Sequence, residues 1–117
     1  MSEREIRQFV DRFYAALDAG DAETAAALFP DGTEIHLWDG RTFTTQAEFR
    51  AWFEKLRARS DNARREVVDL QVDGDEADVR VVLDATFRGE ARRVRLTHRF
   101  LFEGDQVTRV EVEIRPD

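Results

Sequence analysis

The chain has 117 residues, no cysteine and a net charge of −7. This length fits one domain over residues 1–117 with one hydrophobic core, and the lack of cysteine excludes disulfides and thiolate metal sites. The acidic balance argues against nucleic acid as a partner, and no apolar run resembles a membrane span or a signal peptide. We therefore expect a soluble, cytoplasmic protein without a nucleic-acid or membrane partner.

Two helices are predicted within the first 30 residues. Ser2 and Glu5 form a capping box that begins the first helix, and Gly20 suits the left-handed position that ends it. Asp21 can cap a second, short helix that ends at Pro30. The apolar residues that recur at helical spacing in the first helix are Ile6, Phe9, Val10, Phe13 and Leu17.

A hairpin and a third helix follow. The dipeptide DG at 39–40 predicts a two-residue turn between strands at 35–38 and 41–44. The third helix is predicted to begin at Thr45, with Glu48 completing a second capping box. Its inner face carries Phe49, Trp52, Phe53 and Leu56, at positions i, i+3, i+4 and i+7.

The second half of the chain has a period of two, which is typical of β-strands. Evenly spaced glycines at positions 74, 89 and 104 predict the turns of an antiparallel meander of four long strands. The outward faces of these strands carry charges of both signs, which can form cross-strand ion pairs. Such a face suits solvent better than a dimer interface, so we expect a monomer.

Strand parity identifies the inward side chains of this meander. In the first long strand, Arg65 and Val67 are predicted to point inward ahead of a β-bulge near Val68. After the bulge, the even-numbered Leu70 and Val72 of the same strand point inward. In the third long strand, the sequence VRLTHRFLF places His98 among apolar residues on the inward face. A histidine in this position is either a core residue or part of a functional site.

Three helices followed by a curved, bulged antiparallel sheet predict an α+β cone that encloses a pocket. The segment FYAALDAGDAETAAALF resembles the first two helices of the nuclear-transport-factor-2-like (NTF2-like) superfamily, and the order of elements matches over the whole chain. The resemblance implies an NTF2-like fold, in which three N-terminal helices pack on a small hairpin and four long strands.

Few polar side chains are expected inside this cone. Tyr14 and Asp18 lie four residues apart on one face of the first helix, while Arg65 and His98 point inward from the sheet. A negative charge at the helix end that holds Asp18 is unfavourable unless a cation such as Arg65 is close. The structural alternatives are a half-buried ring for Tyr14, a helix-end position for Asp18, a surface position for Arg65 and a core position for His98.

The residues argue against several kinds of chemistry. His36 and His98 are the only histidines and show no paired metal-ligand spacing. Ketosteroid isomerase shares this cone, but Phe13 falls at the place of its tyrosine, and the place of its general-base aspartate falls at about His36 or Leu37, neither of which is an aspartate. Isomerase activity is therefore not expected.

A closer resemblance is to the de novo designed luciferases built on the NTF2-like cone. It rests on stretches along the whole chain, among them IRQF, RFY, GDA, IHLWDG, EFR, WFE and VTxV. IHLWDG, at 35–40, is specific because the fold does not demand its histidine and tryptophan. On these stretches the sequence is identified as a redesigned relative of that family.

This resemblance implies oxidation of diphenylterazine, a synthetic imidazopyrazinone luciferin related to coelenterazine, by O2 without a metal or an organic cofactor. It also implies that the pairs Tyr14–His98 and Asp18–Arg65 are catalytic, whereas Ser60 stands where the family has a further arginine. The expected substrate-binding residues are Phe13, Trp38, Phe49, Trp52, Phe53, Leu56, Ser60, Leu83, Leu96, Phe100, Val110 and Val112.

The expected mechanism divides the work between the two pairs. Arg65, held by Asp18, would stabilise the deprotonated substrate in a dry pocket. His98, with a pKa near neutrality, would accept or relay the proton. The alternative is a small-molecule-binding scaffold of the same fold that does no chemistry, which ligand-induced stabilisation without light would favour.

Overall fold

The computed structural model describes residues 1–115 and places three helices on a six-stranded sheet. The elements are α1 (Glu3–Ala19), α2 (Ala22–Ala27), β1 (Glu34–His36), β2 (Thr42–Phe43), α3 (Gln46–Ala58), β3 (Ser60–Asp73), β4 (Glu76–Phe87), β5 (Glu90–Glu103) and β6 (Gln106–Ile114). The sheet order is β2-β1-β6-β5-β4-β3, with a parallel pairing of β1 with β6 and antiparallel pairing of the other neighbours.

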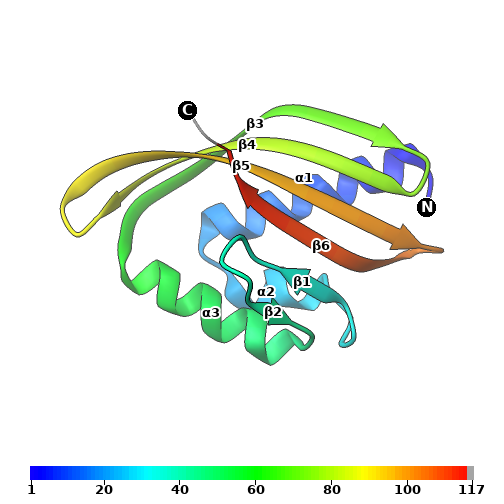
Figure 1. The fold of residues 1–117 in the computed structure, drawn as a ribbon, viewed down its shortest axis with the longest axis horizontal. Coiled ribbons are helices and arrows are strands. Elements are labelled where there is room, and N and C mark those ends of the chain that lie inside the picture. The colour runs from blue at the N-terminus through cyan, green and yellow to red at the C-terminus, as the bar shows by residue number, and fades with distance from the viewer. Residues whose placement is uncertain (116–117) are drawn as a thin grey trace.

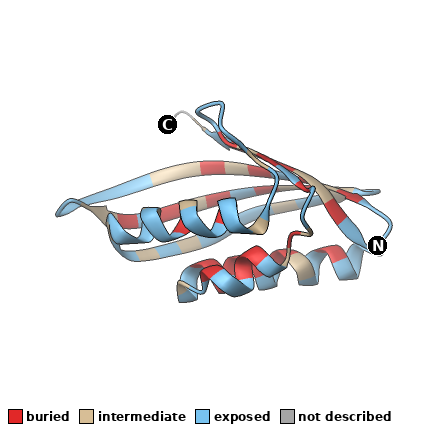
Figure 2. Ribbon diagram, turned by 90° about the horizontal axis from the view of Figure 1, so that it is seen from below, coloured by how far each residue is buried: buried red, intermediate tan, exposed pale blue. Residues whose placement is uncertain are grey.

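The four long strands arch over the helices (Figure 1). Buried residues lie on one side of α1 and along the central parts of the strands, whereas most of α3 and the strand ends are exposed (Figure 2). The hydrophobic core therefore lies between the helices and the concave face of the sheet, and the predicted α+β cone is confirmed. None of the helices within residues 1–115 is both long and apolar enough to cross a membrane.

The helix ends follow from their capping residues. The Ser2 hydroxyl accepts a hydrogen bond from the Glu5 N–H, and the Glu5 carboxylate accepts one from the Ser2 N–H, each at 3.1 Å. Gly20 ends α1 with a φ of 70°. The Asp21 carboxylate accepts a hydrogen bond from the Thr24 N–H at 3.0 Å and begins α2. These observations confirm the predicted ends of α1 and the start of α2, but α2 ends at Ala27, before the predicted Pro30.

The third helix, α3, is capped by Thr45 as predicted, and the Thr45 hydroxyl accepts a hydrogen bond from the Glu48 N–H at 3.2 Å. The second capping box is incomplete, because the Glu48 carboxylate accepts from the backbone N–H of Thr44 instead of that of Thr45.

Two register shifts bend β3. One lies at Val68, as predicted, and the other lies between Asp61 and Arg64, where Asn62 has a φ of 55°. The second shift has no counterpart in the sequence-based prediction. Val67 pairs with the buried Val81 and so lies on the inward face, as predicted, but it is still 39% exposed because β3 is an edge strand with one neighbouring strand instead of two.

The predicted two-residue turn is also wrong, because the connection between β1 and β2 takes in residues 37–41. The Asp39 carboxylate accepts hydrogen bonds from the backbone N–H of Arg41 at 3.1 Å and from its side chain at 2.8 Å. These bonds stabilise the wider turn. Trp38 consequently lies in the loop rather than in a strand.

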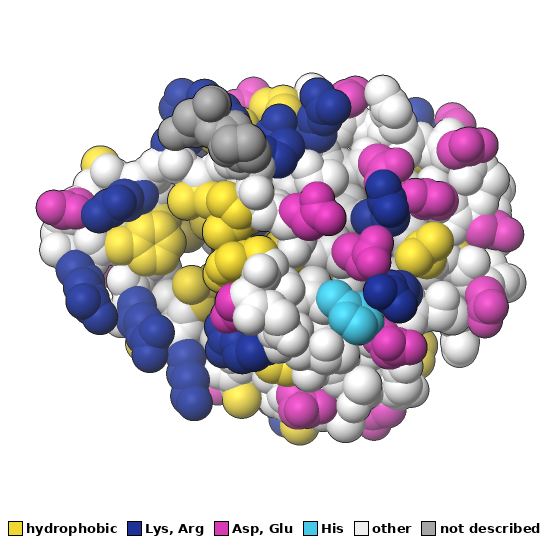
Figure 3. Space-filling view, viewed as in Figure 1, with side chains coloured by type: hydrophobic (Ala, Val, Ile, Leu, Met, Phe, Trp, Pro, Cys, Tyr) yellow, Lys and Arg dark blue, Asp and Glu magenta, His cyan; other side chains and the backbone are white. Residues whose placement is uncertain are grey.

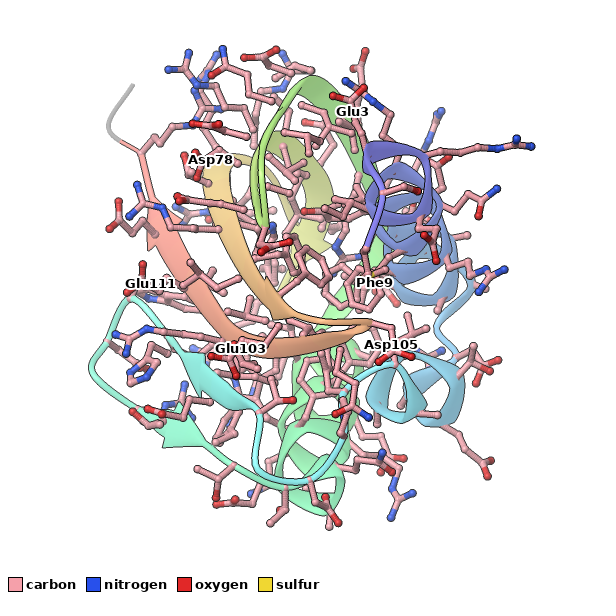
Figure 4. The ribbon with its side chains drawn as sticks, turned by 90° about the vertical axis from the view of Figure 1, so that its right-hand side faces the viewer. Glu3, Phe9, Asp78, Glu103, Asp105 and Glu111 are labelled. Carbon is pink, nitrogen blue, oxygen red and sulfur yellow. The ribbon has the colours of Figure 1, made fainter. Side chains whose placement is uncertain are left out.

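The convex face of the sheet carries the ion pairs that the sequence predicted. Arg93 and Asp84 pair across β5 and β4 at 2.8 Å, and Arg99 contacts Asp78 at 3.1 Å and Glu111 at 3.6 Å. Figure 4 shows Asp78 and Glu111 on the outer side of the strands. This charged layer keeps the outside of the cone in contact with water.

Gly20 is needed for its left-handed backbone conformation, with a φ of 70°. A Cβ atom there would lie 2.5 Å from the guanidinium of Arg57, but this is the end of a flexible, exposed side chain that can move away. We expect Gly20→Ala to lower the free energy of unfolding, measured by urea denaturation, by about 1 kcal/mol, the cost of a left-handed alanine.

Gly74→Ala is the matched control, since Gly74 has a φ of 59° and an added Cβ would meet nothing within 4 Å. It should lose the same amount, about 1 kcal/mol. A loss in Gly20→Ala that clearly exceeds the loss in Gly74→Ala, and that a second substitution, Arg57→Ala, relieves, would contradict a movable Arg57.

Candidate functional site

An apolar cavity of about 230 Å³ lies between the concave face of the sheet, α1, α3 and the β1–β2 loop. Figure 3 shows a hollow on this side of the molecule that is bordered by hydrophobic side chains. Two titratable side chains, Arg65 and His98, contribute to its walls. Within residues 1–115, no group of three or more histidine, aspartate and glutamate side chains is arranged to hold a metal ion.

Nine of the twelve predicted substrate-binding residues line this cavity, and three lie elsewhere. Phe100 is fully buried in the core, while Phe53 and Ser60 line a neighbouring hollow. Strand parity and helical spacing give the face on which a side chain lies, and its depth depends on neighbours that the pattern does not contain. The nine are Phe13, Trp38, Phe49, Trp52, Leu56, Leu83, Leu96, Val110 and Val112.

Seven further lining residues were not among the predicted ones. Phe87, Val94 and Ile114 lie on inward strand faces, so the period of two was the signal that would have found them. Leu37 lies in the loop whose length was predicted wrongly. The others are Leu17, Phe29 and Ile35.

The structure brings Asp18 and Arg65 together at the end of α1. The Asp18 carboxylate accepts hydrogen bonds from the backbone N–H of Arg65 at 3.1 Å and from its guanidinium at 3.2 Å. The cation offsets the unfavourable position of a carboxylate at a helix C-terminus. The Arg65 side chain is 7% exposed and that of Asp18 is 36% exposed, so the pair reaches from the cavity wall to solvent.

Arg65 places a cation in an apolar wall. Burial lowers the pKa of its guanidinium, and Asp18 opposes this shift. Arginine nevertheless remains charged at neutral pH. Its Cζ lies 5.8 Å from the centre of the Phe53 ring, within cation–π range. In such surroundings the charge acts on a ligand more strongly than it would in water.

Tyr14 and His98 form the second polar pair. The Tyr14 hydroxyl lies 2.6 Å from Nδ1 of His98, and both side chains are buried. His98 lines the cavity and Tyr14 does not, so Tyr14 lies behind the imidazole. Within residues 1–115, neither the Tyr14 hydroxyl nor Nε2 of His98 has another hydrogen-bond partner.

His98 is neutral at physiological pH. Burial and, to a smaller extent, the charge of Arg65 lower the pKa of His98 from 6.5 to about 3. The expectation of a pKa near neutrality is therefore wrong, because a strand pattern reports the direction of a side chain and not its desolvation. Burial also raises the pKa of Tyr14 far above 10, so the phenol stays protonated.

The hydrogen bond between this pair decides which nitrogen of His98 carries the proton. The Tyr14 hydroxyl donates to Nδ1, since the reverse arrangement would leave a buried O–H unpaired at a cost of roughly 1–3 kcal/mol. The proton of His98 is then on Nε2, the nitrogen that Tyr14 does not engage. The cavity therefore presents two donors, the guanidinium of Arg65 and Nε2–H of His98.

A second hollow of about 360 Å³ lies next to the cavity, at the C-terminal ends of α1 and α3. We call it the polar recess, because its lining includes Asp18, Arg57, Ser60, Asp61 and Asn62. Five residues border both hollows, namely Leu17, Leu56, Arg65, Leu83 and Phe87. Arg65 is thus the cation at the boundary between an apolar and a polar compartment.

A strongly curved sheet that covers three helices and an internal cavity defines an NTF2-like cone. The SnoaL-like domain family matches residues 10–110, and the chain belongs to that family. No curated protein is significantly similar in sequence.

Solved structures of the same fold carry different functional descriptions. A putative polyketide cyclase from Xanthomonas campestris pv. campestris has a TM-score of 0.83 and 16% identity, covering 96% of this chain and 91% of its own. A hypothetical protein with a ketosteroid isomerase-like fold from Catenulispora acidiphila, in complex with trimethylamine, has a TM-score of 0.81 and 17% identity, covering 89% of this chain and 82% of its own. An LEH-like epoxide hydrolase from M. tuberculosis has a TM-score of 0.80 and 12% identity, covering 96% and 84%. These similarities establish the fold, and the function has to be argued from the site.

The low pKa of His98 predicts a loss of stability in mild acid. Between pH 6.5 and about 3 the unfolded chain binds a proton that the folded protein does not, so this contribution is complete above pH 6.5 and decreases as the pH falls. From pH 6.5 to 5 we expect the free energy of unfolding to fall with a slope that approaches about 1.4 kcal/mol per pH unit. Urea denaturation at each pH measures the free energy of unfolding. The variant His98→Gln should lack the part of the pH dependence that comes from His98. The same slope in both proteins would contradict a buried, neutral His98.

Proposed function

We propose that the protein is a luciferase that oxidises a synthetic imidazopyrazinone, diphenylterazine, with O2 and without a metal or an organic cofactor. The luciferin is then its small-molecule partner. The resemblance of stretches such as IHLWDG to designed luciferases supports the substrate class. The single observation that carries the proposal is the buried guanidinium of Arg65 in the wall of a cavity suited to an aromatic ligand.

The chemistry begins with the loss of the ring N–H proton of the substrate to water. The negative charge that remains spreads to the carbonyl oxygen. Arg65 and Nε2–H of His98 stabilise this anion, since both are donors that need no reorganisation as the charge develops. In this account His98 holds a hydrogen bond and does not move a proton. Tyr14 positions the imidazole from behind.

The remaining steps are reactions of the substrate with O2. The anion adds O2 at the carbon next to the carbonyl. The peroxide then attacks the carbonyl carbon, whose bond to the ring nitrogen breaks with the electron pair going to that nitrogen, and a dioxetanone forms. Cleavage of the O–O and C–C bonds releases CO2, which contains one oxygen atom of O2, and leaves the other in an excited amide. The protein contributes a cavity with mostly apolar walls, which keeps water from quenching the emitter.

Arg65→Ala should reduce light output by about 100-fold, the effect of removing one preorganised group that stabilises an anion. The assay mixes purified protein with diphenylterazine in air, with a chelator present. The thermal midpoint should change little, because an unpaired Asp18 can be hydrated: its side chain is already 36% exposed.

Arg64→Ala is the matched control, since Arg64 is the exposed neighbour of Arg65 on the same strand. It should keep the light output within about twofold. Darkness of the folded wild-type protein would refute the luciferase activity. Parallel losses of light and of stability in Arg65→Ala would make Arg65 a structural residue.

A second candidate is a small-molecule-binding protein without catalysis. The observation that favours it is the composition of the cavity, in which the titratable residues are limited to Arg65 and His98. Diphenylterazine would then raise the thermal midpoint while being recovered unchanged. Consumption of O2 together with release of CO2 separates the luciferase from this alternative.

A further inference from the structure

The apolar cavity is small for a luciferin with several aromatic rings. Its volume of about 230 Å³ lies below the roughly 300–1,000 Å³ that is usual for drug-sized ligands. The polar recess provides about 360 Å³ on the other side of a shared wall. The two hollows together reach the usual range, so an elongated ligand has room if it occupies both.

Arg65 is in the right place for a ligand that spans them. Its guanidinium borders both hollows, with Asp18 at 3.2 Å on the recess side. Leu17, Leu56 and Leu83 border both hollows as well, and side chains of this kind commonly change rotamer when a ligand binds. A ligand whose charged core contacts Arg65 therefore extends one end into each compartment.

The recess has features that the stability of the fold does not require. Its lining includes Asn62, which has a left-handed φ of 55° at the unpredicted bulge. The side chains of Arg57, Asp61 and Asn62 have no hydrogen bond or ion pair with other residues in the range 1–115. Arg57 lies over the backbone of Gly20 and is the strongest of the unpaired donors.

The charges of the recess favour a neutral ligand group. Arg57 and Arg65 balance Asp18 and Asp61, so a full anion or cation gains no net attraction there. A neutral hydrogen-bond acceptor can accept from the unpaired guanidinium of Arg57 without being repelled by the carboxylates. A nitrogen heteroaryl group, such as pyridyl, has this chemistry on a flat aromatic ring, which suits a recess whose lining includes Phe53 and Phe87.

We propose that the polar recess is a second ligand subsite, which binds a neutral aryl group carrying a hydrogen-bond acceptor while the apolar cavity binds a plain aryl group. The anionic core of the ligand lies between the two hollows, at Arg65. That this ligand is an imidazopyrazinone luciferin rests on the proposed function. Arg57 is the residue that determines specificity in the recess.

Binding under argon tests this subsite without depending on light. The probes are three imidazopyrazinones with the same core: one with a single phenyl group, one with two phenyl groups, and one with a pyridyl ring in place of the second phenyl. Trp38 and Trp52 both line the apolar cavity, so quenching of their fluorescence reports the dissociation constant of each probe. Light emission is measured separately in air.

Ala63→Phe fills the recess, because Ala63 lines it and does not line the apolar cavity. This substitution should raise the dissociation constants of both two-ring probes by about tenfold and keep that of the single-phenyl probe within twofold of its wild-type value. Ala51→Phe, on the exposed face of α3, should change none of the three. Ser60→Leu fills the same space and replaces Ala63→Phe if circular dichroism shows that the latter does not fold.

Arg57→Met tests the chemistry of the recess. Wild-type protein should bind the pyridyl probe at least about fivefold more tightly than the two-phenyl probe, and Arg57→Met should abolish this preference. Arg50→Met, an exposed position on α3, should retain it.

Several results would overturn the subsite. They are an unchanged affinity of the two-ring probes in Ala63→Phe, an equal loss for the single-phenyl probe, and a pyridyl preference that is absent or that survives in Arg57→Met. A hydroxyphenyl probe that binds more tightly than the pyridyl one would likewise contradict the acceptor chemistry. A dark protein that shows the expected binding pattern would refute the luciferase alone, and a bright protein without the pattern would refute the subsite alone.

Discussion

The contact between Asp18 and Arg65 connects the architecture of the cone to its site. One carboxylate receives both the backbone N–H and the guanidinium of Arg65, and so joins the end of α1 to the bulged start of β3. A partly buried ion pair of this kind adds little net stability, because desolvation of the charges offsets their attraction. Its clearer effect is geometric, since it holds a cation between the cavity and the recess.

The same desolvation gives the two polar pairs different roles. Removing water strengthens the field of Arg65 at the cavity wall, and the same burial lowers the pKa of His98 to about 3. An imidazole in this environment is a poor base and, with Tyr14 donating to Nδ1, a good donor through Nε2. The site is therefore better suited to holding an anion than to moving a proton, which agrees with chemistry that belongs largely to the substrate.

Local signals in the sequence predicted much of the fold, and three-dimensional context decided the rest. Capping boxes and Gly20 mark helix ends because their hydrogen bonds lie within a few residues, and a parity change locates the bulge at Val68. The bulge at Asn62 rests on one left-handed backbone conformation, and the β1–β2 loop is shaped by the hydrogen bonds of the Asp39 carboxylate, neither of which a periodic pattern reports. The pKa of His98 and the existence of the polar recess arise where distant elements meet, so no sequence window contains them.

The ionisation of the bound luciferin tests the central claim most directly. Its visible absorption can be titrated under argon, free in solution, bound to wild-type protein and bound to Arg65→Met. Stabilisation of the anion by Arg65 predicts that binding to wild-type protein lowers the apparent pKa of the luciferin, and that Arg65→Met abolishes most of this shift. An apparent pKa that is the same in both proteins, or that is raised by binding, would contradict the account.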